Sequence, residues 1–219
     1  MTTLSVFDVE VPWDIDTLEG FRRWVATLDE HAPRVHYSPG MVHLEMPQNY
    51  RDHGPVAEAI NKVLLVLADE LDLGQYHAPP SWITHAETRL STEPDGFLLL
   101  WESLASGRVR INPQRETELL GRPDMALEVV SRSSAKKDLV KLVENYAAAG
   151  VREYWIADPR GAEVVFRILV LQADGTYGDQ PVGSGGWIAS PLWHRSFRLT
   201  YYVDRLGTPT PRLEVGPGA

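Results

Sequence analysis

Apolar residues recur every three or four positions in three segments of the chain, the spacing of a helix with one buried face. The longest segment lies between Gly54-Pro55 and Gly74, and its apolar positions are Val56, Ile60, Val63, Leu64, Leu67 and Leu71. Proline is favoured at the start of a helix and glycine just past its end. A shorter helix is predicted from Leu18, and a third from about residue 135 to 149, ending at Gly150.

Shorter apolar runs predict strands in the rest of the chain. Residues 34–45 have the pattern of a hairpin whose tip is Pro39-Gly40. With that tip, one face carries Val35, Tyr37, Val42 and Leu44, and the other carries Arg34, His36, His43 and Glu45. Further strands are predicted at 81–84, 96–101, 124–130, 153–158, 163–171 and 187–203. The order of elements predicts an α/β fold, on the border of α+β, with a mixed sheet flanked by helices.

A chain of 219 residues is long enough for one domain with a substantial core. We expect a single domain over residues 1–206 and a flexible tail over 207–219, because six of the last thirteen residues are Gly or Pro. Residues 1–20 contain acids but no basic residue, and no apolar run approaches the length of a membrane span. The absence of cysteine excludes disulfides, thiolate zinc sites and cysteine nucleophiles. Together these features predict a cytoplasmic protein.

The net charge of −9 is unfavourable for holding a long duplex by its phosphates. Basic residues are nevertheless concentrated between positions 108 and 141, where eight Lys or Arg occur with five Asp or Glu. Any contact with a polyanion is therefore expected in this segment.

Carboxylates precede or interrupt two of the predicted strands. Asp95 follows a proline before the strand at 96–101, and Asp124 follows a proline before the strand that contains Glu128. On a regular strand Asp124 and Glu128 point to the same face, and Asp95 joins them if its strand is adjacent. Three acids so close repel one another unless they are protonated or bridged by a cation. Mg²⁺ suits such a site because it prefers a few carboxylates and water.

Other interpretations of these residues stay open. A single Pro-Asp pair before a strand is more often a turn or a cap than part of a site. Glu128, in contrast, interrupts a run with the composition of an interior strand, and a buried carboxylate must be paired or metal-bound. His36 and His43, with Glu45 beside them, form an alternative transition-metal site, although the chain lacks a tight spacing such as His-Glu-x-x-His.

One long stretch resembles a known family. Residues 121–134 read Gly-Arg-Pro-Asp-Met-Ala-Leu-Glu-Val-Val-Ser-Arg-Ser-Ser, and residues 146–159 read Tyr-Ala-Ala-Ala-Gly-Val-Arg-Glu-Tyr-Trp-Ile-Ala-Asp-Pro. They resemble the Uma-two family of restriction endonucleases, in the PD-(D/E)XK nuclease superfamily, and the likeness extends from about Leu18 to Leu199. The resemblance implies a restriction-endonuclease-like fold and a Mg²⁺ cofactor, for which Mn²⁺ can substitute. It implies Asp95 and Glu128 as catalytic metal ligands, with Asp124 beside them as a third ligand.

The chain departs from the family pattern at two positions that matter for catalysis. The superfamily motif places a lysine two residues after the second acid, where this chain has Val130, and the family's first hairpin often carries a glutamate where this chain has His36. The resemblance implies that Lys141, in the following helix, takes the role of the missing lysine. Helical geometry disfavours Lys141, which falls opposite the apolar stripe of that helix, and Lys136 at the helix start is the alternative. Candidate contacts for substrate phosphates are Lys136, Lys137 and Arg132.

The sequence therefore predicts a Mg²⁺-dependent phosphodiester hydrolase, and most simply a DNA endonuclease whose partner is DNA. A homodimer is also expected, because one compact site cuts only one strand. The alternative is a catalytically weak or inactive nucleic-acid- or protein-binding module on the same fold, which the acidic balance and the missing strand lysine favour. Hydrolysis of a small nucleotide is a third hypothesis that fits the negative charge.

Overall fold

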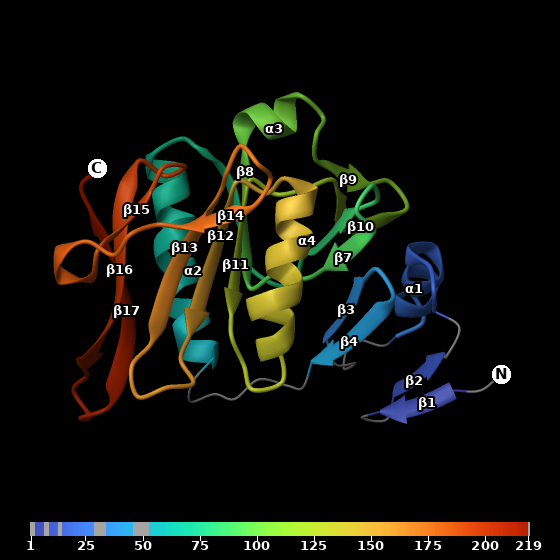
Figure 1. Ribbon diagram of the computed structural model, residues 1–219, viewed down its shortest axis with the longest axis horizontal. Helices are drawn as coiled ribbons and strands as arrows, with labels where there is room; N and C mark the ends of the chain where they lie inside the picture. Colours follow the sequence, from blue (N-terminus) through green and yellow to red (C-terminus); the bar gives the residue numbers. More distant parts are fainter. Residues whose placement is uncertain (1–2, 7–8, 13–14, 29–33, 46–52, 219) are drawn as a thin grey trace.

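The computed structural model describes residues 3–6, 9–12, 15–28, 34–45 and 53–218 (Figure 1). Its centre is a six-stranded mixed sheet in which β11 and β12 run parallel and all other neighbours run antiparallel. In spatial order the strands are β14 (Tyr177–Asp179), β13 (Val165–Leu171), β12 (Glu153–Asp158), β11 (Met125–Val129), β8 (Gly96–Leu100) and β5 (Gly74–His77). The parallel pair requires a crossover connection, which contains the helix α4 (Leu142–Ala149).

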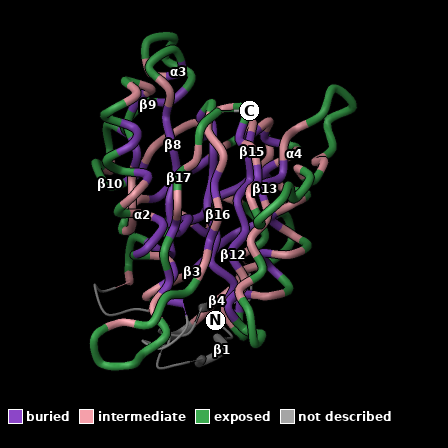
Figure 2. The backbone as a smooth tube through the Cα atoms, turned by 90° about the vertical axis from the view of Figure 1, so that its left-hand side faces the viewer, coloured by how far each residue is buried: buried purple, intermediate pink, exposed green. Residues whose placement is uncertain are grey.

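Two helices cover the two faces of this central sheet. Alternate residues of β11 belong to two apolar clusters, one that includes α2 (His53–Glu70) and one that includes α4. The α2 cluster contains Met125, Leu127 and Val129, and the α4 cluster contains Ala126 and Val130. Side chains alternate between the two faces of a strand, so Glu128 is on the face that α4 covers. Figure 2 shows buried residues along the central strands and exposed residues in the loops at the ends of the molecule.

A second six-stranded sheet carries the predicted hairpin. Its strands, in spatial order, are β4 (Met41–Glu45), β3 (Arg34–Ser38), β7 (Leu90–Thr92), β6 (Trp82–His85), β10 (Arg115–Leu120) and β9 (Arg110–Asn112). The hairpin pairs His36 with His43 and turns at Pro39-Gly40, as the sequence predicts. Its predicted apolar face is also confirmed, because that face packs in the cluster that includes α1 (Leu18–Val25). The members of that face are Val35, Tyr37, Val42 and Leu44.

The remaining elements are short. They are the strand pair β1 (Thr3–Val6) and β2 (Val9–Pro12), the helix α3 (Trp101–Ala105), the π-helical turn η1 (Lys137–Lys141) and the 3-10 turn η2 (Ser184–Gly186). Two predicted helices differ in extent from the observed ones. The helix α2 ends at Glu70, and Gly74, the predicted helix end, is instead the first residue of β5. The helix predicted at 135–149 is divided into η1 and α4. In the described part of the chain, no helix has both the length and the apolar character to cross a membrane.

The prediction of a flexible tail over 207–219 is wrong for its described residues. Pro209–Gly216 is strand β17, which pairs with β16 (Arg195–Val203) along its whole length, in a sheet completed by β15 (Ile188–Ser190). Leu213 of β17 is buried in the cluster that includes α2. Prolines at 209 and 211 obscured this strand in the sequence. An edge strand such as β17 tolerates proline, because the missing N–H would point away from the sheet.

Candidate active site

Four elements meet at one end of the central sheet (Figure 1). They are the C-terminal end of β11, the π-turn η1, the N-terminal end of α2, and the hairpin β3–β4. Arg34 of β3 and His53 of α2 both contact Asp95, while Lys137 of η1 contacts Glu128 of β11. This end of the sheet is the candidate active site.

Asp95 and Glu128 occupy facing positions at the ends of neighbouring strands. The antiparallel register of β8 and β11 pairs Gly96 with Leu127, so the next pair outward is Asp95 and Glu128. The amide of Val129 donates a hydrogen bond of 2.8 Å to Oδ2 of Asp95, which fixes the aspartate beside β11. The strands are therefore adjacent, the condition under which the sequence predicts that these two acids converge.

Asp95 is held as an anion by its neighbours. Its side chain is buried, with Nη1 of Arg34 2.8 Å from Oδ1 and Nε2 of His53 3.0 Å from Oδ2. Burial by itself raises the pKa of a carboxyl group. Here His53, Arg34 and the amide of Val129 outweigh burial and hold the pKa of Asp95 well below its ordinary value. Asp95 therefore carries a negative charge throughout the neutral pH range.

Glu128 is buried against a tyrosine and a lysine. Its Oε1 accepts a hydrogen bond of 3.0 Å from the hydroxyl of Tyr146, and its Oε2 lies 3.6 Å from Nζ of Lys137. Lys137 is only 4 % exposed, and its Nζ also lies 3.1 Å from Oδ1 of Asp138. Asp138 in turn accepts a hydrogen bond from the hydroxyl of Ser134. Two carboxylates thus offset the desolvation of one buried ammonium group.

The π-turn explains why the sequence suggests Lys137 only as a phosphate contact and does not place it beside Glu128. Tyr146 follows Lys137 by nine positions, and nine residues make about two and a half turns of a regular α-helix. An unbroken helix would therefore present the two side chains on opposite sides. The wider i to i+5 hydrogen bonding of the turn rotates the residues before it relative to α4. As a result, Lys137 and Tyr146 both reach Glu128.

The lysine suggested by the family resemblance lies elsewhere. Nζ of Lys141 is 3.7 Å from Oε2 of Glu144, three positions later on the exposed side of the helix. The structure thus corrects the prediction that Lys141 replaces the missing strand lysine, because Lys137 is the one that lies beside Glu128. Arg132 and Lys136 are exposed on the segment that leads into the π-turn, and they remain candidate phosphate contacts.

Asp124 does not join the pair of acids. Its Oδ2 accepts a hydrogen bond of 2.9 Å from the amide of Leu100, and its Oδ1 accepts one of 2.9 Å from the hydroxyl of Ser103. Arg152 also lies 3.5 Å from Oδ1. Four residues of an extended strand, the separation from Glu128, span about 13 Å. The predicted third metal ligand is therefore a buried anchor for the start of α3, at the opposite end of β11.

His36 is buried within electrostatic reach of Lys137 and has no hydrogen-bond partner among the described residues. Its side chain is 2 % exposed, and neither ring nitrogen has a hydrogen bond to any residue that the structure describes. Burial, reinforced by the positive charge of Lys137 and by His43, holds the pKa of His36 well below its ordinary value. The ring is therefore neutral at pH 7. An unsatisfied buried polar group costs about 1–3 kcal/mol, so this histidine destabilises the fold unless something binds it.

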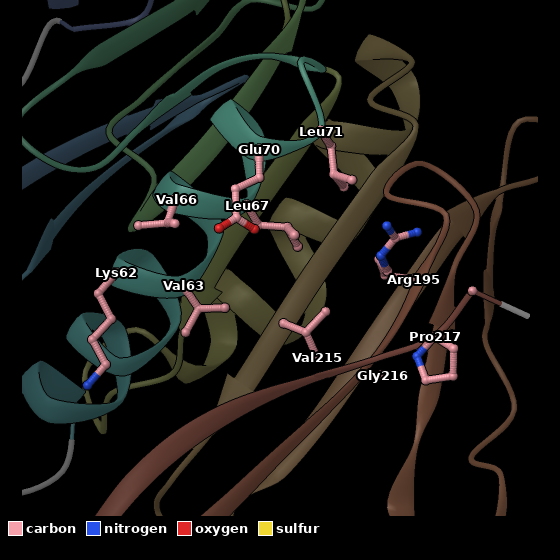
Figure 3. Close-up of a pocket in the computed structure, with 11 residues that line it drawn as sticks. Lys62, Val63, Val66, Leu67, Glu70, Leu71, Arg195, Val215, Gly216 and Pro217 are labelled. Carbon is pink, nitrogen blue, oxygen red and sulfur yellow. The ribbon is translucent and has the colours of Figure 1, made fainter.

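A cavity of about 370 Å³ opens beside Asp95. Its polar and charged lining residues are Arg34, His53, Glu58, Asn61, Lys62 and Asp95. A separate cavity of about 970 Å³ lies between α2 and β17, where Leu67 and Val215 are among its apolar walls (Figure 3). Neither Asp95 nor Glu128 lines this second cavity. Of these two cavities, the smaller one therefore gives access to Asp95.

The donor set at this end of the sheet fits a hard divalent cation that keeps several water ligands. Asp95 and Glu128 supply two carboxylates, the protein ligands that Mg²⁺ prefers. Among the described residues, no group of three or more Asp, Glu, His or Cys is arranged as a complete metal site. Water or a substrate phosphate would therefore fill the other coordination positions.

The arrangement of sheet and helices is shared with solved proteins. The chain is similar to the crystal structure of a putative nuclease belonging to DUF820 from Anabaena variabilis, with a TM-score of 0.58 and 19% sequence identity. The match covers 81% of this chain and 90% of that chain. The fold is thus a mixed α/β fold of the restriction-endonuclease-like class.

Residues 18–201 match the model of the Uma2 (Uma-two) family, which is described as a putative restriction endonuclease. The chain belongs to this family. No curated protein matches it.

Proposed function

We propose that this chain is a metal-dependent phosphodiester hydrolase that cuts DNA. Its family, described as restriction endonucleases, supports a nuclease. One observation supports the chemistry most directly: the carboxylate of Asp95 accepts a hydrogen bond from the amide of Val129, the residue after Glu128, and the buried Nζ of Lys137 lies 3.6 Å from Glu128. Phosphoryl transfer is catalysed mainly by positioning and by stabilising the charge on the phosphate oxygens. A pair of acids beside an ammonium group is suited to both.

Asp95 and Glu128 would hold the metal ion. We infer Mg²⁺, with Mn²⁺ as a substitute, because both ions take carboxylate and water oxygens as ligands. When bound, such an ion supplies an activated water and neutralises charge on the transferring phosphoryl group.

The other groups of the site would prepare these two acids and the substrate. Arg34 and His53 keep Asp95 ionised. The hydroxyl of Tyr146 fixes the orientation of the Glu128 carboxylate. Lys137 holds a positive charge beside Glu128, where it would stabilise negative charge that develops on a phosphate.

DNA as the substrate is supported by two exposed basic residues next to the site. Arg132 and Lys136 are exposed immediately before the turn that carries Lys137. Contacts of this kind with backbone phosphates position a duplex without reading its sequence. Two chains acting together would present one site to each strand of a duplex. Light scattering on the purified protein, with and without DNA, measures that self-association.

The test is a cleavage assay on supercoiled plasmid and on single-stranded DNA. The parent protein is incubated with Mg²⁺ or Mn²⁺, and then with EDTA, beside the variants Glu128→Gln and Glu144→Gln. Glu144 is a matched control, because it is a glutamate on the exposed side of the neighbouring helix. We expect metal-dependent nicking whose rate Glu128→Gln lowers by at least about a hundredfold. Losing a residue that only supports a metal ligand costs up to about a hundredfold, so losing a ligand should cost at least as much.

Two results would reject the proposal. Nicking that survives EDTA or the Glu128→Gln substitution would exclude these acids as the catalytic centre. Binding of DNA without any cleavage would favour the non-catalytic binding module on the same fold. Circular dichroism of both variants shows whether a loss of nicking reflects a loss of folding.

A further inference from the structure

His36 and His43 form a pair of imidazoles beside the acids, and the proposed hydrolysis does not use them. They face each other across β3 and β4, with ring centroids 5.4 Å apart and ring planes inclined by 58°. His36 is 2 % exposed, and both of its nitrogens lack a hydrogen-bond partner among the described residues. A buried ring with two unused nitrogens points to a ligand that supplies the missing bond.

The spacing of the two rings suits one shared metal ion. With metal–nitrogen bonds of about 2.0–2.1 Å, each centroid lies about 3.2 Å from the ion, and a tetrahedral angle then separates the centroids by about 5.2 Å. The observed separation of 5.4 Å is close to this value. The inclination of the planes shows that the rings are not stacked face to face, so their nitrogen-bearing edges can converge on one point.

The charges around the pair can accommodate a cation. Lys137 is close enough to act electrostatically on His36, but its ammonium group already lies between Glu128 and Asp138. Arg34, two residues before His36 on β3, is also a cation, and it pairs with Asp95. Carboxylates therefore outnumber these cations, and a divalent ion would reduce the excess negative charge.

We propose that His36 and His43 bind a divalent transition-metal ion of the zinc, nickel or cobalt type. Imidazole nitrogen favours these ions, whereas Mg²⁺ prefers carboxylate and water oxygens. Two protein nitrogens leave the remaining coordination positions to water. The site lies beside Asp95 and Glu128 but uses other ligands, so it is independent of the hydrolysis proposed above.

Titration of the metal-free protein with Co²⁺ tests this site. Cobalt bound to nitrogen at low coordination number gives visible absorption bands, and their growth measures affinity. We expect saturable binding by the parent protein that His36→Gln and His43→Gln each weaken at least about tenfold. The control His194→Gln alters an exposed histidine outside the site and should bind as the parent does. Glu128→Gln should also retain these bands, whereas the proposed hydrolysis needs Glu128.

Equal affinity for Co²⁺ in the parent and in His36→Gln would overturn the proposal. Displacement of bound Co²⁺ by Mg²⁺ as readily as by Zn²⁺ would also overturn it. A second measurement needs no variant and so does not depend on the folding of one. Crystals of the parent protein soaked in Co²⁺ should show an anomalous-scattering peak between His36 and His43. A peak only between Asp95 and Glu128 would support the proposed hydrolysis and reject the histidine site. A peak at the histidines in a protein that cannot cut DNA would reject the hydrolysis alone.

Discussion

The two ends of β11 carry buried acids in different surroundings. At the N-terminal end, Asp124 accepts hydrogen bonds from the backbone and the hydroxyl group that start α3. At the C-terminal end, Glu128 meets a tyrosine hydroxyl and the ammonium group of Lys137. Both acids are 2 % exposed, so burial does not distinguish them.

The difference between the two acids lies in what their partners do for the fold. Asp124 accepts a hydrogen bond from a backbone amide, and its negative charge balances the positive charges of two arginines. These contacts join α3 to β11. Around Glu128, a π-turn brings a buried ammonium group inward, and His36 carries ring nitrogens without a hydrogen-bond partner in the described structure. A buried charge that needs such irregular backbone is costly for a fold. The partners of a buried acid, more than its burial, therefore distinguish an anchor of the fold from a functional site.

The sharpest test of this comparison is the stability of Asp124→Asn. The substitution removes the charge that the amide of Leu100 and the hydroxyl of Ser103 contact, and it leaves Arg152 without its buried partner. Hydrogen bonds to charged groups contribute about 1.5–3 kcal/mol each, so we expect the free energy of unfolding to fall by about 2–4 kcal/mol. Urea titration measures this change.

Asp179→Asn is the control for that experiment, because Asp179 pairs with Arg167 on the surface and exposed pairs contribute little. At a temperature where Asp124→Asn is still folded, its nicking rate should stay within about threefold of the parent. If Asp124→Asn were as stable as the parent but inactive, Asp124 would belong to the site and the comparison would fail.

A second test compares two lysines of one helical segment. Lys137→Met should lower the nicking rate by about a hundredfold, the usual effect of removing a group that stabilises developing charge. Lys141→Met should leave it within about twofold, because Lys141 pairs with Glu144 on the helix surface and exposed pairs contribute little. Rates at saturating DNA separate catalysis from binding. Equal losses in both variants would indicate a general electrostatic contribution to DNA binding instead.

The smallest expected effect concerns Glu118, a third buried acid that resembles Asp124 in being fully engaged. Burial would raise the pKa of Glu118, but hydrogen bonds from Arg22, Thr84 and Asn112 hold it below its ordinary value. A carboxylate with a lowered pKa stabilises the folded state at pH values above its unfolded pKa of about 4.3. That stabilisation is lost as the pH falls through the folded pKa.

Glu118→Gln should therefore lower Tm at pH 7 and flatten the fall of Tm below about pH 5. Calorimetry at several pH values, with Glu144→Gln as the exposed control, measures the slope. If Tm falls as steeply at acid pH in Glu118→Gln as in the parent, other carboxylates control acid unfolding.

Several parts of the fold follow from local patterns in the sequence. The register of the hairpin β3–β4 follows from alternation about Pro39-Gly40. The burial of Glu128 follows from the apolar run that it interrupts, since such a run specifies an interior strand. The sequence predicts both the strand after Asp95 and the strand that contains Glu128. It leaves open whether these two strands are neighbours.

The parts that the sequence did not reveal depend on non-local or irregular backbone. Lys137 reaches Glu128 through a π-turn, and helical periodicity assumes a regular helix. Asp124 and Glu128 share a face of their strand in the sequence pattern. Sharing a face does not bring two side chains close along the strand, and Asp124 lies at the end opposite Glu128. Strand β17 contains two prolines that local patterns assign to a loop, and only its pairing with β16 makes it a strand.

Those same prolines limit how copies of this protein can assemble. An open strand at the border of a sheet invites a strand from another molecule, because its free amides and carbonyls form a ready template. Pro209 and Pro211 remove two amide donors from the outer side of β17. Fibre-like growth along this border is thereby discouraged.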